Sequence, residues 1–244
     1  MAQHSHPVSS SRGPVAQAAD PGPAPEVFTA AVGGIAALRP RPGVEFEPLP
    51  APRRLASFSH ALSATVTQRR DGEDEEVETG SGRFVLLYEP DGHEEWLGSW
   101  RCVTFLQADL EPEIAEDPLL AEVTWSWLCE ALSGLGCAAL GGTVSRCASS
   151  GFGELADQGT STSVELRASW SPLPPEPSTG GGALRGRLAE ARAAAIGSPW
   201  GQWTPQAAWD GVAAHVRAWS ECLATVVGLP PELAGVARLP RLGG

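Results

Sequence analysis

Alternating apolar and polar positions in several segments of the chain predict β-strands with one buried face. Residues 61–68 (ALSATVTQ) alternate aliphatic and hydroxyl-bearing side chains, which is the two-residue period of a half-buried strand. Residues 162–170 (TSVELRASW) show this period most clearly, with apolar side chains at every even position from 164 to 170. Residues 140–147 (LGGTVSRC) form a further strand candidate before it.

Residues 83–110 predict a β-hairpin whose second strand is apolar on both faces. The unbroken apolar run over residues 84–88 is typical of a central strand, and residues 90–92 (PDG) provide the turn. The second strand alternates its apolar side chains between the two faces of the sheet, with Trp100, Cys102 and Leu106 on one and Val103 and Phe105 on the other. We therefore expect this strand to be covered on both sides.

Apolar residues three and four positions apart predict helices near both ends of the chain. Residues 26–38 (EVFTAAVGGIAAL) have this spacing, although Gly33 and Gly34 weaken the helix. A long helix is expected from Thr204 and Pro205 to just before Gly228. The apolar stripe of this last helix must pack on another element, and it consists of Trp209, Val212, Val216, Trp219, Leu223 and Val226.

Residues 116–136 (EDPLLAEVTWSWLCEALSGLG) predict a helix with two tryptophans two positions apart. At 100° per residue, Trp127 lies near the middle of a broad apolar arc, and Trp125 lies about 160° further round, towards the side of Glu122. We therefore expect Trp127 in the core. Trp125 has two interpretations, a ring that shields the rim of the helix or a contact for a partner.

The order of these elements predicts a single α+β domain. A helix, three strands, a helix, two strands and a helix correspond to a mostly antiparallel sheet of about five strands backed by helices. We expect a disordered tail over residues 1–24, the α+β core over 25–171, a Pro- and Gly-rich linker over 172–182 and a C-terminal helical segment over 183–244, packed on the core or on a second copy. A similar order occurs in the type III secretion chaperone fold of dimeric peptide-binding modules, although fold does not fix function.

Charge and composition narrow the classes of function. The chain of 244 residues has a net charge of -12, and residues 71–130 hold 17 acidic side chains against only Arg83 and Arg101. Because such a field repels phosphate backbones, it argues against nucleic-acid binding and favours a basic protein partner or plain solubility. The chain has no lysine, which excludes Schiff-base chemistry and the phosphate-binding lysine of a Walker A loop. Without a membrane span or a secretory signal, a cytoplasmic protein is expected.

The candidate chemical groups do not form a catalytic or metal-binding motif. Five cysteines without a C-x-x-C pair are expected to be buried and free rather than paired. The carboxylates of residues 108–117 (ADLEPEIAED) suit the positive end of the following helix better than a metal ion. His215 is expected to pack among small residues of the last helix. We predict no catalytic residue, metal or cofactor, but Arg146 and Arg167 could flank each other and bind an anion, unless they pair with nearby glutamates.

Several segments together resemble a protein family. They are GRFVLLYEPDG (82–92), ADLEPEIAEDPLLAEVTWSWL (108–128), GGTVSR (141–146), VELRASW (164–170) and GLPPELAGV (228–236). Over roughly residues 25–236 the chain resembles an actinobacterial family of unknown function, the domain-of-unknown-function family three thousand. This resemblance implies an intracellular bacterial protein from a GC-rich genome, but it assigns no activity and no catalytic residue.

Two functions are consistent with these observations. The first is a non-catalytic protein-binding or regulatory module that uses its acidic surface, through Trp125, Glu122, Trp200 and Trp203, to bind a protein partner or a second copy. The alternative is an enzyme or small-molecule binder with a pocket beneath the loop of residues 148–161, using Arg146 and the carboxylates near Asp109. The missing nucleophile and base favour the first function.

Overall fold

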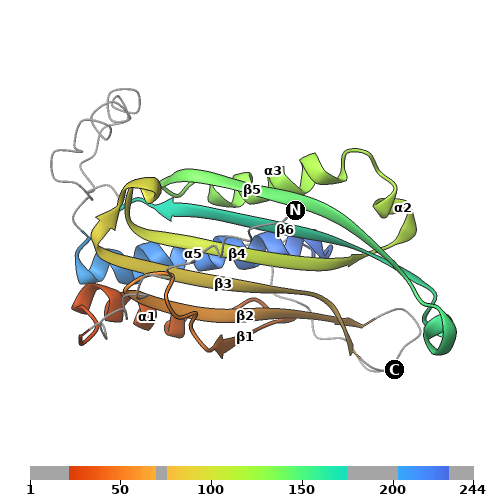
Figure 1. Cartoon of the computed structure of the whole chain (residues 1–244), viewed down its shortest axis with the longest axis horizontal. Helices are drawn as coiled ribbons and strands as arrows, with labels where there is room; N and C mark the ends of the chain where they lie inside the picture. Colours follow the sequence, from red (N-terminus) through yellow and green to blue (C-terminus); the bar gives the residue numbers. More distant parts are fainter. Residues whose placement is uncertain (1–21, 70–75, 175–202, 231–244) are drawn as a thin grey trace, which may run out of the picture.

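The computed structural model describes residues 22–69, 76–174 and 203–230, which form one antiparallel sheet and the helices that pack on it (Figure 1). The strands are β1 (Val44–Leu49), β2 (Phe58–Arg69), β3 (Glu76–His93), β4 (Gly98–Leu110), β5 (Cys137–Ser150) and β6 (Thr160–Pro172). The helices are α1 (Glu26–Ala37), α2 (Pro112–Ala115), α3 (Leu120–Leu132) and α5 (Pro205–Val226), with short 3-10 turns η1 (Glu94–Trp96) and η2 (Gly153–Gln158).

The predicted α+β class with an antiparallel sheet is confirmed, but the sheet has six strands in the order β1-β2-β3-β4-β6-β5. The additional strand is β1, which lies in a proline-rich stretch after α1 that has no strand pattern. Proline lacks the N–H group that a central strand needs, but it is tolerated in a strand at the edge of a sheet. β1 occupies such an edge and pairs with β2 alone.

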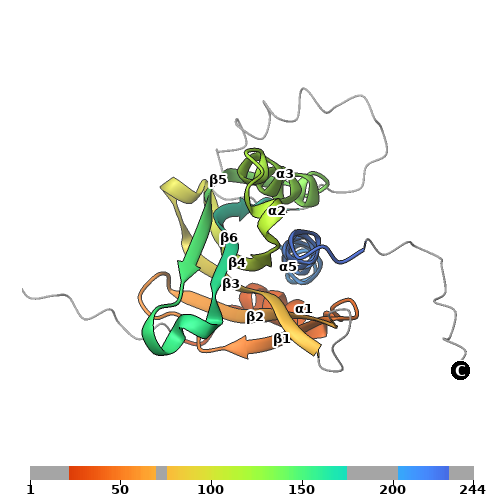
Figure 2. The ribbon, with the colours of Figure 1, turned by 90° about the vertical axis from the view of Figure 1, so that its right-hand side faces the viewer.

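The helices α1, α3 and α5 all lie on one face of the sheet, as the end-on view shows (Figure 2). The buried side chains of the strands point to this face, including the even-numbered residues of β2 and β6 that the alternation predicts as inward. The long helix α5 packs against α1, α3 and the strands β3, β4 and β6. Residues 205–226 therefore complete the core of their own chain.

The two glycines of α1 allow α1 and α5 to approach closely. A Cβ atom at Gly33 would lie 2.5 Å from the ring of Trp209, and one at Gly34 would overlap the backbone carbonyl of Trp209. The low helix propensity of glycine is therefore offset by packing that no residue with a side chain permits. The N-terminus of α5 agrees with prediction, because the Thr204 hydroxyl accepts a hydrogen bond from the Ala207 N–H at 3.1 Å.

The buried arc of α3 differs from the predicted one. Its buried residues are Leu120, Thr124, Leu128 and Leu132, which centres the arc about 80° from each of the two tryptophans. Trp125 and Trp127 therefore flank the arc and are both half-buried against the core. The expectation that Trp127 is central is wrong because Thr124, a polar residue, is fully buried. Its hydroxyl is satisfied by donating to the Leu120 carbonyl at 2.7 Å.

The hairpin of β3 and β4 also turns later than expected. β3 continues to His93, and the reversal takes place at η1 and Leu97, whose backbone is left-handed with a φ of 54°. The predicted tail over residues 1–24, the linker over 172–182 and the first part of the C-terminal segment lie largely outside the described residues. No helix in the described ranges is long and apolar enough to span a membrane.

Candidate functional site

The face of the sheet opposite the helices carries apolar side chains that no described element covers. On β4, Val103 is 37% exposed, and Phe105 is half-buried beside it. Val85 on β3 is the cross-strand partner of Val103. The expectation of cover on both sides of β4 is therefore met on the helix side only, within the part of the chain that the structure describes. An uncovered antiparallel face is ordinarily polar, so this apolar strip is a candidate binding surface.

The strand register arranges this face in two adjacent rows that cross the whole sheet. The first, which we call the apolar row, runs from β1 to β5 through Leu49, Ala61, Val85, Val103, Ser169 and Gly141. The second, the arginine row, runs through Glu47, Ser63, Arg83, Phe105, Arg167 and Thr143. Most of these residues line one groove of about 870 Å³. The rows lie two residues apart along each strand, which is about 7 Å.

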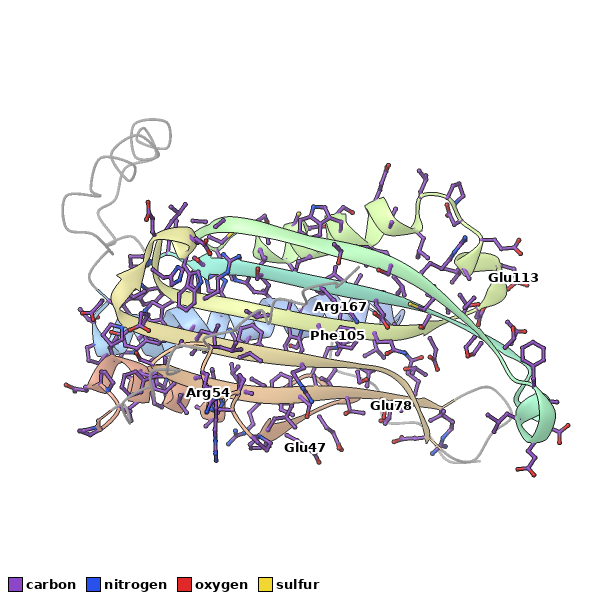
Figure 3. The ribbon with its side chains drawn as sticks, in the orientation of Figure 1. Glu47, Arg54, Glu78, Phe105, Glu113 and Arg167 are labelled. Atoms are coloured by element: carbon purple, nitrogen blue, oxygen red, sulfur yellow. The ribbon has the colours of Figure 1, made fainter. Side chains whose placement is uncertain are left out.

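Phe105 lies between two arginines on the neighbouring strands. The guanidinium of Arg167 is 5.0 Å from the centre of the Phe105 ring, close enough for a cation–π contact, and Figure 3 shows the two side chains together in the middle of the sheet. The same guanidinium pairs with Glu165 at 2.7 Å, while the Arg167 side chain stays 60% exposed. Arg83 is the cross-strand partner of Phe105 on the other side and is also exposed.

A third arginine holds the strands together at the end of the groove. Arg101 donates to the hydroxyl of Ser169 at 2.6 Å, to that of Ser171 at 3.3 Å and to the Ala139 carbonyl at 3.0 Å. Partial burial lowers the pKa of this guanidinium from its ordinary value. Arg101 therefore ties β4 to β6 and β5, and one of its acceptors, Ser169, lines the groove.

The structure separates the two arginines that the sequence suggests as an anion site. Arg167 pairs with Thr143 across β5 and β6, whereas Arg146 pairs with Val164, whose side chain points into the core. The two guanidinium groups therefore lie on opposite faces of the sheet. Arg146 instead donates to the Ala115 carbonyl of α2 at 2.7 Å, and Arg167 pairs with Glu165, as the alternative interpretation expected.

The predicted partner-binding residues that the structure describes lie in two places, Trp125 and Glu122 on α3 and Trp203 near Trp100 of β4. Trp125 packs against the sheet, since a Cβ atom at Gly142 of β5 would lie 2.9 Å from its ring. Glu122 is exposed on α3. Trp203 is half-buried with its ring centre 5.8 Å from that of Trp100, and Trp200 lies outside the described residues.

His215 is packed in the core, as expected. It is 2% exposed, and its Nδ1 accepts a hydrogen bond from the indole N–H of Trp170 at 3.2 Å. Burial lowers the pKa of His215 to about 4, so the ring is neutral near pH 7. Partial burial also lowers the pKa of His60. A neutral histidine held by an indole in a closed core has no access to a substrate.

All five cysteines are free, but only Cys102 and Cys222 are buried as expected, whereas Cys129, Cys137 and Cys147 are half-buried. Burial raises the pKa of Cys222 to about 12 and that of Cys102 well above its ordinary value, so neither thiol is reactive at neutral pH. Among the described residues, no group of three or more histidine, cysteine or acidic side chains is placed to hold a metal ion. In the acidic segment before α3, Asp117 accepts a hydrogen bond from the Leu119 N–H at 2.8 Å.

The loop of residues 148–161 forms the tip of the β5–β6 hairpin, which projects beyond the helices (Figure 1). Its η2 turn exposes Phe152 and Leu155. Neither the groove of the open face nor a smaller cavity beside α5 includes a residue of this loop.

The sequence indicates the groove only through the apolar side chains on both faces of β4. The arginine row could not be predicted, because it depends on β6 lying between β4 and β5 in the sheet.

One comparison with known proteins identifies a related family. The family model described as protein of unknown function (DUF3000) matches residues 24–237. No curated protein and no solved structure matches the chain.

Proposed function

We propose that this chain, which belongs to the DUF3000 family of proteins of unknown function, is a non-catalytic binding module that holds a protein partner on the open face of its sheet. The observation that carries this proposal is the apolar strip of Val85, Val103 and Phe105 on the face without helices. Burying one such side chain fully contributes about 1.5–3 kcal/mol. Because Val103 is 37% exposed and the other two side chains are half-buried, a partner that covers this strip would gain roughly a third of that free energy for each residue.

The two rows indicate the chemistry of the partner. The apolar row offers aliphatic contacts, and the arginine row offers the guanidinium groups of Arg83 and Arg167 on either side of an aromatic ring. Arginine and aromatic residues are common at the centres of protein interfaces. We infer a partner segment that presents an apolar side chain and a carboxylate about 7 Å apart.

This inference differs from the one that net charge suggests. The overall charge of -12 favours a basic partner, and exposed acids such as Glu122 on α3 are available for one. The groove itself, however, is lined by two arginines and by no carboxylate, and Glu165, which lies outside this lining, pairs with Arg167 alone and leaves the charge of Arg83 in excess. At contact distance the local charge outweighs distant charges, which salt screens over about 8–10 Å. We therefore place the main contact in the groove and assign the acidic surface a secondary role.

A small amphipathic carboxylate is the second candidate for the groove. The volume of about 870 Å³ lies within the range of small-molecule sites, which is about 300–1,000 Å³. Such a ligand would use the same apolar and guanidinium contacts. If the protein binds a small molecule, we therefore infer that the site is this groove and not a pocket under the loop of residues 148–161.

Paired variants of the full chain test the protein-binding role. The intact protein is used to capture and identify a partner from its native extract, and binding to that purified partner is then measured by calorimetry. Phe105→Ala and Arg167→Gln alter the groove, while Val123→Ala removes an exposed apolar side chain on α3 as the matched control. Circular dichroism confirms that all of the variants are folded.

We expect Phe105→Ala to weaken binding of the purified partner by at least tenfold and Val123→Ala to leave it unchanged, because truncating a central aromatic contact costs about 2 kcal/mol or more. Full binding by both groove variants would refute the proposal. Loss of binding in Glu122→Gln alone would move the contact to the acidic surface of α3. Binding of small carboxylates but no protein would select the second candidate.

A further inference from the structure

A small cavity between the segment after α1 and the second half of α5 is surrounded by arginines. Its volume is about 210 Å³, which is room for about seven water molecules. Arg39 and Arg41 line it from the segment after α1, and Arg217 and Glu221 line it from α5. Three arginines and one glutamate line the cavity, so its lining has two excess positive charges on a chain whose net charge is -12.

The local sequence makes the segment that carries two of these arginines rigid. Residues 39–42 read Arg-Pro-Arg-Pro, and each proline fixes its own φ and restricts the residue before it to extended backbone. Arg39 and Arg41 both line the cavity, and the prolines therefore hold their backbone in place before any ligand binds.

Arg41 is the anchor of the cavity. Its side chain is only 5% exposed, and its Nη1 pairs with Glu221 at 3.2 Å. Its Nη2 donates to the Pro230 carbonyl, and its buried Nε has no hydrogen-bond partner among the described residues. A buried guanidinium with an unpaired donor is unfavourable, so the position of Arg41 leaves one of its donors unsatisfied.

The carboxylate of Glu221 does not neutralise the other two arginines. Glu221 lies one turn after Arg217 on α5, but it forms its ion pair with Arg41. Among the described residues, the Arg39 side chain donates hydrogen bonds to the backbone carbonyls of Ala37 and Leu38, at 3.3 and 3.2 Å. Within the described ranges, Arg39 and Arg217 therefore retain their charge on the rim of the cavity.

We propose that this cavity binds a small tetrahedral oxyanion of the phosphate class. Guanidinium groups donate in a planar fork that matches such anions and favours them over a simple halide. A phosphate dianion would balance the two excess charges and offer acceptor oxygens to the exposed guanidinium groups of Arg39 and Arg217. The cavity shares no lining residue with the groove of the open face, so this site is independent of the proposed partner-binding role.

Titration of the full chain with inorganic phosphate tests the site directly. Binding is followed by calorimetry and by phosphorus NMR in a phosphate-free buffer, with sodium chloride and sodium acetate at matched ionic strength as comparison salts. Arg39→Gln and Arg217→Gln remove charges on the exposed rim and leave the buried Arg41 in place, so the fold is kept. Arg83→Gln is the matched control, because it removes an exposed arginine from the groove.

We expect saturable phosphate binding with a Kd of about 1 mM or tighter, and a loss of about tenfold in each rim variant, as expected for one charge-assisted hydrogen-bonding partner. Chloride and acetate should not compete at equal concentration. Unchanged binding in Arg39→Gln and Arg217→Gln, or the absence of saturation in the intact protein, would overturn the assignment. A loss confined to Arg83→Gln would place the anion in the groove and would equally overturn it.

Discussion

Protonation of His215 should make the stability of this protein fall between pH 7 and pH 5. In the folded protein burial lowers the pKa of His215 to about 4, whereas an unfolded chain has the ordinary value of about 6.5. Between about pH 6.5 and pH 4, His215 is therefore protonated in the unfolded state but neutral in the folded state. The stability is fully present above pH 6.5, is lost progressively as the pH falls, and stops changing below about pH 4.

The magnitude follows from the two pKa values. Between pH 7 and pH 5 this linkage lowers the free energy of unfolding by about 2 kcal/mol, and over the whole window by about 3 kcal/mol. Protonation would also remove the acceptor for the Trp170 indole, because Nδ1 of an imidazolium carries a proton. The buried indole and the charged ring would then both lack a partner in a core that is closed to water.

Urea unfolding of the intact protein and of His215→Gln, followed by tryptophan fluorescence, measures this effect. Glutamine keeps an acceptor for Trp170 but does not titrate, so the difference between pH 7 and pH 5 should shrink by about 2 kcal/mol in the variant. His60, whose pKa is also lowered by burial, titrates in both proteins and cancels in the comparison. Equal pH dependence in the two proteins would show that His215 is accessible to protons in the folded state.

Two further predictions concern packing in the core. Gly34→Ala should lower the free energy of unfolding by about 1–3 kcal/mol, because the added methyl group meets the backbone of Trp209; Gly134→Ala, which meets nothing within 4 Å, should have no such effect in the same urea assay. The thiols of Cys102 and Cys222 should resist a disulfide reagent at neutral pH until the protein is unfolded. Mass spectrometry of the labelled peptides would contradict this if either residue reacted in the native state.

The fold class could be predicted because periodicity reports burial. The even positions of β2 and β6 and the apolar stripe of α5 are buried as the pattern indicates. The pattern does not predict β1, because a strand at the edge of the sheet tolerates a proline such as Pro48. The composition of β1 therefore resembles that of a connecting segment. The predicted orientation of α3 was wrong because hydropathy assigns Thr124 to the surface. In the structure the Thr124 hydroxyl donates a hydrogen bond to a carbonyl of its own helix, and this bond allows the side chain to be buried.

The binding surface could be predicted only in part. Periodicity placed Val103 and Phe105 on the second face of β4, but it could not show that this face stays open in the described structure. The position of Arg167 beside Phe105 depends on the pairing of β4 with β6, which are separated in sequence by α3 and β5. The same limitation applies to the arginine cavity, because the sequence shows Arg39 and Arg41 close together but not their approach to Arg217 on α5.

The two faces of the sheet carry different kinds of ionisable residue, buried neutral groups on the helix side and exposed charged groups on the open side. On the helix side, buried groups such as His215 and Cys222 are kept neutral because no water or counter-ion reaches them. On the open side, charged and apolar residues lie side by side, and the exposed guanidinium of Arg167 covers part of the Phe105 ring. An exposed arginine can move from this ring to a carboxylate with little loss of free energy. In the proposed binding mode, Arg167 shields part of the Phe105 ring in the free protein, and a carboxylate of the partner draws the arginine away and exposes the ring for contact.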